Sequence, residues 1–295
     1  MGLPTVSWSR MTDLFRAFIF IVVGLAGDPE HAELFDKWGT GLVETSEALG
    51  IPRDHILYLD ENVTRVALEQ SFSTLAAQVK PDDVVLICLI GHGSFDGRNA
   101  KFNLTGPDIT PKDFSALLHT LSAQRIVFVN TASASGPFID ELSGPDRIVI
   151  TATRSGTERY TTLFPEFFVD SFVSEDADTD KNGLVTVLEA FNYAQLKVAF
   201  EYERENLLKT EHAKMDDPSK VAGTVFFGSF DDNQLSLDPQ LQALHFERLQ
   251  LEQQIEMLKL LKGSMNAARY IEEFEQLVVA LARKAREIRE FSDAE

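Results

Sequence analysis

Continuously apolar runs recur along the first two-thirds of this 295-residue chain, and a stretch with helical periodicity follows most of them. Strands that are apolar at every position are buried on both faces, whereas strands with one wet face alternate apolar and polar residues. Fully buried strands that alternate with helices build a mostly parallel sheet sandwiched by helices, so we predict an α/β fold. The predicted strands cover residues 18–24, 55–60, 83–90, 125–130 and 147–153.

The helices between these strands are expected near residues 30–49 and 64–79 and from about residue 111. Thr110 and Pro111 favour a helix start at the last of these, because threonine caps a helix and proline suits its first turn. From about residue 165 the pattern becomes mainly helical, which indicates that the sheet is complete by then.

The end of the chain differs in character from the rest. Leu244, Leu251 and Leu258 recur every seven residues, which is the spacing of a coiled-coil seam. We therefore divide the chain into an α/β domain, residues 1–234, and a coiled-coil-like C-terminal helical hairpin, residues 235–295. We expect the hairpin to pack on itself, to join copies of the chain into a homo-oligomer, or to bind a partner protein.

The net charge of −19 argues against nucleic acids and anionic membrane surfaces as partners. Residues 17–27 follow Arg10 and Arg16 and look like the apolar core of a signal peptide, but Asp13 and the β-branched residues favour a buried strand. The run is too short for a transmembrane segment. The lack of a clear signal favours the cytoplasm, and an exported protein whose signal has been removed is the alternative.

Two of the predicted strands end in residues that can do chemistry. The segment LIGHG places His92 at the end of one strand, and FVNTASASG places Ser133 just after another. Functional groups of parallel α/β proteins collect at the carboxyl ends of the strands, so we expect the two side chains to be neighbours. His92 would act as acid or base and Ser133 as nucleophile, while the backbone amides of Gly93 and Ala134 would bind a developing oxyanion.

Taken together, the two motifs resemble those of the caspase/legumain-like cysteine peptidases. In that family one apolar strand ends in His-Gly, and a later strand ends in a short motif that contains Ala-Cys and a glycine. LIGHG matches the first motif with His92, and FVNTASASG matches the second with Ala132 and residues 135–136. Ser133 falls where the family has its catalytic cysteine. The resemblance covers about residues 16–165 and implies a peptide or protein substrate or ligand.

The same resemblance implies a substrate-recognition pocket after the next strand. The segment RIVITATRSGTE matches the family strand whose end contributes to that pocket, and it places Ala152, Thr153 and Arg154 there. The preference of the pocket stays open, because acidic, basic and asparagine-directed pockets all occur in the family.

The serine at position 133 leaves three interpretations open. A thiolate is a strong nucleophile near neutral pH, whereas a serine hydroxyl needs an adjacent base to remove its proton. The chain is therefore a natural pseudopeptidase, an unusual serine-dependent hydrolase, or a cysteine peptidase in which serine has replaced the cysteine. Cys88 does not supply the missing thiol, because it lies in the middle of a predicted strand.

The segment DTDKNGLVTVLE, residues 178–189, matches the calcium-binding loop of an EF-hand at every required position. Calcium prefers six to eight oxygen ligands, and the loop offers them at its conventional positions with a glycine at the sharp turn. The predicted ligands are Asp178, Asp180, Asn182, the carbonyl of Leu184, Thr186 and Glu189. No second loop of this type follows, so we expect a structural Ca²⁺ that holds two helices together rather than a paired sensor.

Overall fold

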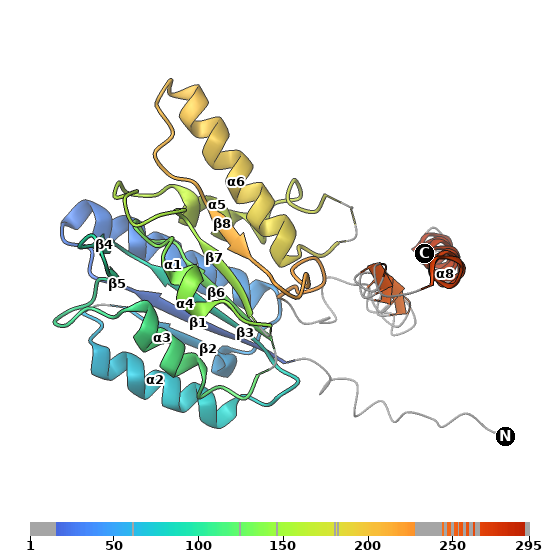
Figure 1. Cartoon of the computed structure of the whole chain (residues 1–295), viewed down its shortest axis with the longest axis horizontal. Helices are drawn as coiled ribbons and strands as arrows, with labels where there is room; N and C mark the ends of the chain where they lie inside the picture. The colour runs from blue at the N-terminus through green and yellow to red at the C-terminus, as the bar shows by residue number, and fades with distance from the viewer. Residues whose placement is uncertain are drawn as a thin grey trace.

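A six-stranded sheet forms the centre of the α/β domain in the computed structural model (Figure 1). The structure describes residues 16–60, 62–123, 125–145, 147–179, 181, 183–227 and 266–292, together with scattered residues between 244 and 262. The strand order is β2-β1-β3-β6-β7-β8. The strands are β1 Ala17–Val23, β2 Ile56–Leu59, β3 Val84–Ile90, β6 Arg125–Asn130, β7 Arg147–Thr151 and β8 Lys214–Asp216.

The first five strands of this order are parallel, and β8 pairs antiparallel with β7 at one edge. The predicted mostly parallel α/β fold is therefore confirmed, and each predicted strand coincides with an observed one to within two residues at either end. The antiparallel edge strand β8 was not predicted, because its three residues Lys-Met-Asp are neither apolar throughout nor alternating over a useful length.

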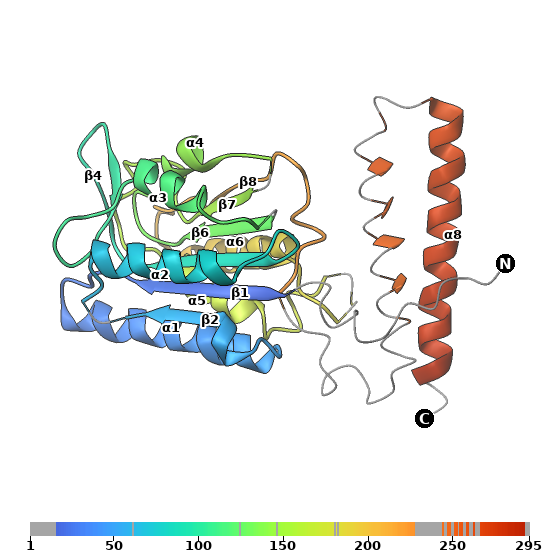
Figure 2. The same cartoon turned by 90° about the horizontal axis from the view of Figure 1, so that it is seen from below.

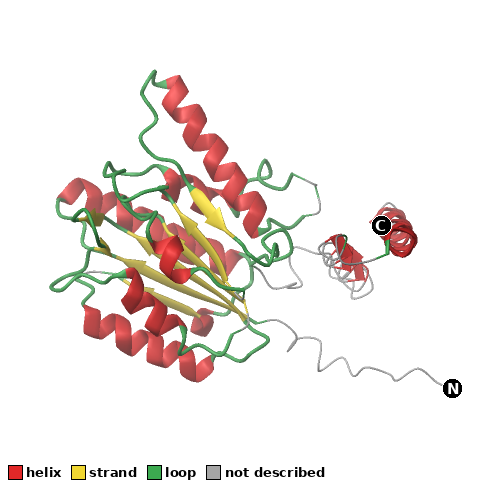
Figure 3. Ribbon diagram, viewed as in Figure 1, coloured by secondary structure: helices red, strands yellow, loops and turns green. Residues whose placement is uncertain are grey.

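Helices cover both faces of the sheet (Figure 3). Successive side chains of a strand point to opposite faces, so Ile19 and Ile21 of β1 enter one core while Phe18 and Phe20 enter the other. One core is completed by helices α1 Pro29–Ala48, α5 Phe164–Ser171 and α6 Val187–Arg204. The other is completed by α2 Arg65–Gln78, α3 Pro111–Leu118 and α4 Phe138–Leu142.

The apolar run near the N-terminus is a strand, as predicted. β1 lies between β2 and β3, and its residues from Phe18 to Val22 are almost completely buried. Among the described residues, no helix combines the length and the apolar character that a bilayer crossing requires.

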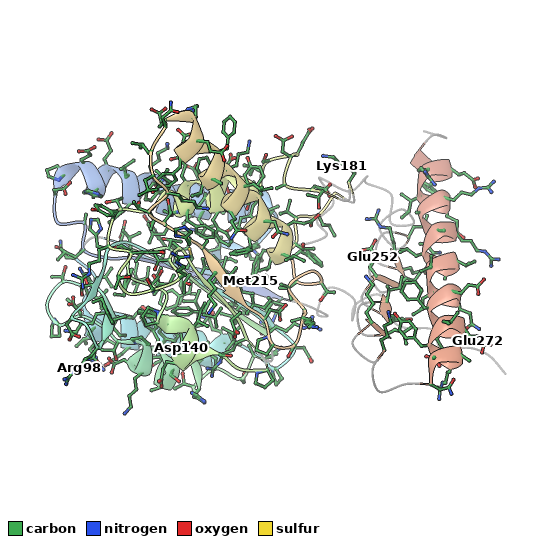
Figure 4. All side chains as sticks on the ribbon, turned by 45° about the horizontal axis from the view of Figure 1, so that its top comes forward. Arg98, Asp140, Lys181, Met215, Glu252 and Glu272 are labelled. Atoms are coloured by element: carbon green, nitrogen blue, oxygen red, sulfur yellow. The ribbon has the colours of Figure 1, made fainter. Side chains whose placement is uncertain are left out.

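A short hairpin that the sequence analysis missed follows β3 directly. Its strands β4 Gly93–Phe95 and β5 Ala100–Phe102 are antiparallel, and the Asp96 carboxylate accepts the amides of Arg98 and Asn99 in the turn. Figure 4 shows Arg98 at the periphery of the domain. Strands of three residues are too short for a periodic signal, although the Asp96-Gly97 pair is a known hairpin-turn sequence.

The described part of the C-terminal region contains the helix α8, Ala267–Ser292, which Figure 2 shows along its whole length. Ile255 and Leu258 of the preceding segment are buried, as is Ile288 of α8, and the Lys284 ammonium contacts Glu247 at 2.6 Å. These contacts fit the predicted helical hairpin. The predicted boundary at residues 234 and 235 lies outside the described residues, and the coiled-coil and oligomer assignments stay predictions.

A buried glutamate from a distant segment caps helix α5. The Glu211 carboxylate accepts the amides of Leu163 at 2.8 Å and Phe164 at 3.3 Å, whereas Leu163 itself offers no capping side chain. Only 2% of Glu211 is exposed, and this burial raises its pKa to about 7 although the two amides favour the charged form. The cap therefore becomes charged near neutral pH, inside the protein.

We expect this cap to make the folded state less stable as the pH rises. In the unfolded chain the pKa of Glu211 returns to about 4.5, so its contribution is complete below pH 4.5 and is lost as the pH rises to about 7. A shift of this size corresponds to roughly 3 kcal/mol in the free energy of unfolding. Glu211→Gln keeps an acceptor and has no proton to lose, so urea unfolding at pH 5 and pH 8 should show a smaller pH dependence than in the parent.

The exposed Glu203 on α6 provides the matched control. Glu203→Gln should leave the pH dependence of the parent unchanged. An equal pH dependence in the Glu211→Gln and Glu203→Gln proteins would contradict the role of burial at Glu211.

Candidate active site

Four loops meet at the carboxyl edge of the sheet. They follow β1, β3, β6 and β7, which are consecutive neighbours in the strand order. The register pairs Leu89 of β3 with Asn130 of β6, and Asn130 with Thr151 of β7, so these strands end almost level with one another. Residues that follow the strands are thereby brought together from distant parts of the sequence.

The loops that carry His92 and Ser133 are in direct contact, as predicted. The amide of Gly93, the residue after His92, donates to Ser133 Oγ at 3.4 Å, and Ser133 Oγ donates to the Gly93 carbonyl at 3.2 Å. A Cβ atom on Gly93 would lie 2.1 Å from the Ser133 carbonyl oxygen, so only glycine permits this approach. Ser133 is 4% exposed and is therefore nearly enclosed by its surroundings.

His92 is half-buried against aromatic neighbours. Its ring centroid lies 4.5 Å from that of His31 and 5.0 Å from that of Phe35, both in edge-on contact. Burial lowers the pKa of His92 below the usual value for histidine, and His31 lowers it further, against smaller opposing effects of the Ala26 backbone and Asp28. The imidazole is therefore neutral at pH 7 and has a ring nitrogen that can accept a proton.

The sequence analysis missed His31, whose ring packs against His92, and Asp28, which contacts His31. Asp28 caps α1 by accepting the His31 amide at 2.9 Å, and its second oxygen lies 2.7 Å from His31 Nδ1. These contacts, the backbone amide first, lower the pKa of Asp28. With a proton on Nδ1, Nε2 accepts a hydrogen bond from the Thr161 hydroxyl at 3.0 Å. These two contacts fix the orientation of the His31 ring. The strand-end rule applied to β1 would have pointed to both residues.

The two predicted oxyanion donors differ in their surroundings. The Gly93 amide is directed at Ser133 Oγ, as described above. The Ala134 amide donates to the Glu158 carbonyl at 2.7 Å, and it is therefore occupied in this structure. Ala134 also has a φ of +54°, in the left-handed region that non-glycine residues seldom adopt. Both oxyanion roles stay predictions.

The predicted pocket residues after β7 also differ from each other. Thr153 is completely buried, and its hydroxyl accepts the Gly136 amide at 3.0 Å and contacts Ser135 Oγ at 3.1 Å. It therefore ties the end of β7 to the loop of Ser133, and it has no surface to offer a substrate. The Arg154 side chain is exposed, and its Nε lies 3.0 Å from Glu158. Its predicted part in substrate recognition stays a prediction.

The predicted calcium loop lies between α5 and α6 on the domain surface, where Figure 4 labels Lys181. Gly183, at the sharp turn, has a φ of +83°, and its amide donates to Asp178 Oδ2 at 2.8 Å. Glu189 and Thr186 form a capping box at the start of α6. Leu184 precedes this box, while the predicted ligands Asp180 and Asn182 lie outside the described residues.

The carboxylate of Glu189 also accepts the amide of Thr179 at 3.0 Å and its hydroxyl at 2.8 Å. The beginning and the end of the loop are therefore held together, as an encircled ion would require. Within the described residues, no group of three or more histidine, cysteine or acidic side chains is arranged to hold a metal ion. Calcium binding stays a prediction.

Comparison with known proteins places this arrangement in a family. Residues 61–219, more than half of the chain and including His92 and Ser133, match the sequence profile of the peptidase C13 family. No curated protein matches the chain. A solved structure of caspase-1 from Spodoptera frugiperda is similar over 73% of this chain and 90% of the caspase chain, with 11% sequence identity and a TM-score of 0.48. On the strength of the profile match, this chain belongs to the peptidase C13 family.

Proposed function

We propose that this chain binds peptide or protein ligands at the carboxyl edge of its sheet and is catalytically inactive as a peptidase. Membership of a peptidase family supports the ligand class. The observation that carries the proposed inactivity is the hydrogen bond from Ser133 Oγ to the Gly93 carbonyl. A serine nucleophile needs a base to take its proton, and among the described residues no hydrogen bond joins Ser133 to the His92 ring.

An active endopeptidase is the second candidate. It is favoured by the lowered pKa of His92, which keeps the ring neutral and able to accept a proton, and by the Gly93 amide beside Ser133 Oγ. In this case the chain is a serine-dependent hydrolase, or Ser133 stands in place of a native cysteine. The codon for residue 133 in the native gene decides between the last two possibilities.

We further propose a structural calcium ion in the loop of residues 178–189. The closure of the loop by Glu189, together with the left-handed turn at Gly183, supports this proposal. Asp178, Asp180, Asn182, Thr186 and Glu189 would contribute side-chain oxygens, and Leu184 its carbonyl. When bound, the ion would offset the repulsion among the carboxylates and fasten the start of α6 to the residues before it.

The first experiment changes the nucleophile. The protein with Ser133 should hydrolyse a panel of peptides with acidic, basic or asparagine residues before the scissile bond no faster than Ser133→Ala. Ser133→Cys should exceed both by at least about tenfold, because a thiol ionises far more readily than a hydroxyl. His92→Ala in the Ser133→Cys protein should remove this gain. The rates are measured by mass spectrometry of the cleaved peptides.

Robust hydrolysis by the serine protein that Ser133→Ala abolishes would contradict the proposed inactivity and support the serine-dependent hydrolase. If the Ser133→Cys protein is alkylated at the introduced thiol but hydrolyses nothing, the thiol is accessible and reactive, and the site has lost other parts of its catalytic machinery.

The second experiment tests calcium by thermal unfolding with chelator, magnesium and millimolar calcium. The single loop suggests a Kd of roughly 10⁻⁵ to 10⁻³ M. At the tight end of this range millimolar calcium is about a hundredfold excess over Kd, which adds about 2–3 kcal/mol to the free energy of unfolding. Calcium should therefore raise the midpoint by roughly 5–10 °C, and magnesium should raise it less.

Glu189→Gln is the informative variant, because glutamine can still cap α6 but cannot bind calcium as a bidentate carboxylate. It should lose most of the calcium-dependent rise, whereas Asp176→Asn, outside the ligand pattern, should keep it. Equal midpoints for the parent with chelator and with calcium, together with no calorimetric binding signal, would show that the loop only imitates a calcium site.

A further inference from the structure

The loop of residues 158–163 touches both halves of the candidate active site. The Glu158 carbonyl accepts the Ala134 amide at 2.7 Å, and the Thr162 hydroxyl donates to the Thr131 carbonyl at 2.5 Å. These two contacts lie on either side of Ser133 in the sequence. Thr161 also contacts His31 Nε2, whose ring packs against His92. One loop therefore holds the segment around Ser133 and the neighbour of His92 at the same time.

A strap of residues 210–213 fastens this loop at both of its ends. The His212 amide donates to the Glu158 carboxylate at 3.1 Å, and His212 Nδ1 lies 2.9 Å from it. At the other end, Glu211 accepts the amides of Leu163 and Phe164. Two adjacent side chains of the strap therefore reach the two ends of one loop.

The strap is itself anchored to helix α6. Thr210 Oγ1 lies 2.9 Å from Tyr202 Oη, and Gln195 Nε2 donates to the Ala213 carbonyl at 3.2 Å. The chain then enters β8 at the edge of the sheet. The core of the domain therefore fixes the position of the loop through the strap.

Glu158 is the point where these contacts converge. Its side chain is 11% exposed and contacts four nitrogen atoms, two of Arg154 and two of His212. Its carbonyl, in turn, holds Ala134. A glutamine at this position would offer one acceptor oxygen in place of two, so part of the junction would be lost. A nitrogen donor that loses its acceptor where water cannot replace it is left unsatisfied, which costs free energy.

We propose that Glu158 is a positioning residue, which acts with His212 of the strap to hold residue 133 in register with Gly93 and His92. This inference rests on the proposed function in so far as residue 133 is the reactive position. Glu158 acts through the Ala134 amide and through Thr161, and it does not itself contact the reacting atoms. Loss of the junction lets the Ser133 segment move away from the Gly93 amide, which would otherwise stabilise negative charge on residue 133.

The Ser133→Cys protein turns this position into a chemical reporter. The native thiol, Cys88, is completely buried, and burial raises its pKa to about 12, so it should resist iodoacetamide. The protein with Ser133, in which Cys88 is the one cysteine, gives the background rate of alkylation. The rate constant for alkylation of the introduced thiol, measured from pH 5 to pH 10, reports both the reactivity of this thiol and its pKa.

In the Ser133→Cys protein, Glu158→Gln should slow alkylation of the introduced thiol at pH 7 by roughly tenfold and raise the midpoint of the pH profile by about one unit, because the thiolate loses stabilisation. The matched control is Glu69→Gln, which breaks a similar Arg-Glu pair four residues apart, at 2.9 Å, on α2. This control should leave the rate and the midpoint unchanged. His212→Ala should act like Glu158→Gln, and His212→Asn, which keeps a donor near the Nδ1 position, should restore most of the rate.

Hydrogen exchange provides a second measurement that does not require a reactive thiol. In the protein with Ser133, exchange of the Ala134 amide should be at least about tenfold faster in Glu158→Gln than in Glu69→Gln, because its acceptor is no longer fixed. Faster exchange with an unchanged alkylation rate and midpoint would reduce Glu158 to a structural role and overturn the proposal. Unchanged exchange would overturn it as well.

A failure of the proposed function can be distinguished from a failure of this inference. If the Ser133→Cys protein resists alkylation at the introduced thiol, position 133 is not the reactive centre, and hydrogen exchange alone then decides whether Glu158 holds the loop. If Glu158→Gln does not fold, the pair His212→Ala and His212→Asn carries the test, because equal rates in these two proteins would contradict the proposal.

Discussion

Burial of the parallel sheet on both faces is the constraint on which the rest of the structure depends. Phe18 and Phe20 of β1 fill one core, and Ile19 and Ile21 fill the other, so a slip of one residue would exchange every side chain between two differently shaped cores. The register is thereby fixed, and with it the level at which β3, β6 and β7 end. The contact between the loops of His92 and Ser133 is a consequence of this packing, because the strands that carry the two loops already hold them side by side.

Once the strand ends are fixed, the site is assembled mainly from backbone contacts. Gly93 lies against the Ser133 carbonyl, and Gly136 lies so close to Arg154 that an added Cβ would be 2.3 Å from its carbonyl carbon. Such contacts transmit small displacements directly, because a close-packed interior does not deform continuously. The position of Ser133 is therefore sensitive to the loop that holds Ala134, and this loop depends on Glu158 and on a strap from a distant part of the chain.

The sequence predicted the parts of the molecule that have a local signal. The run of residues 125–130 coincides with β6, and the strand-end rule brought His92 and Ser133 together. The same rule would also have indicated His31, which lies in the first turn of the helix that follows β1. Glu158 and Glu211 carry no such signal, because the contacts between the strap and the loop span 47 to 54 residues and are made mostly to backbone amides, which nearly every residue has.

The surroundings of His92 affect a serine nucleophile and a cysteine nucleophile differently. Burial and His31 both disfavour the imidazolium, and the Ala26 backbone and Asp28 oppose them less strongly. A serine hydroxyl must transfer its proton to this ring as it attacks, so it meets the cost of the buried cation directly. A thiol can lose its proton before it attacks, and the resulting thiolate beside His92 would itself favour the imidazolium. This argument supports the proposal that Ser133, whose hydroxyl donates a hydrogen bond to the Gly93 carbonyl, is a poorer nucleophile in this site than a cysteine would be.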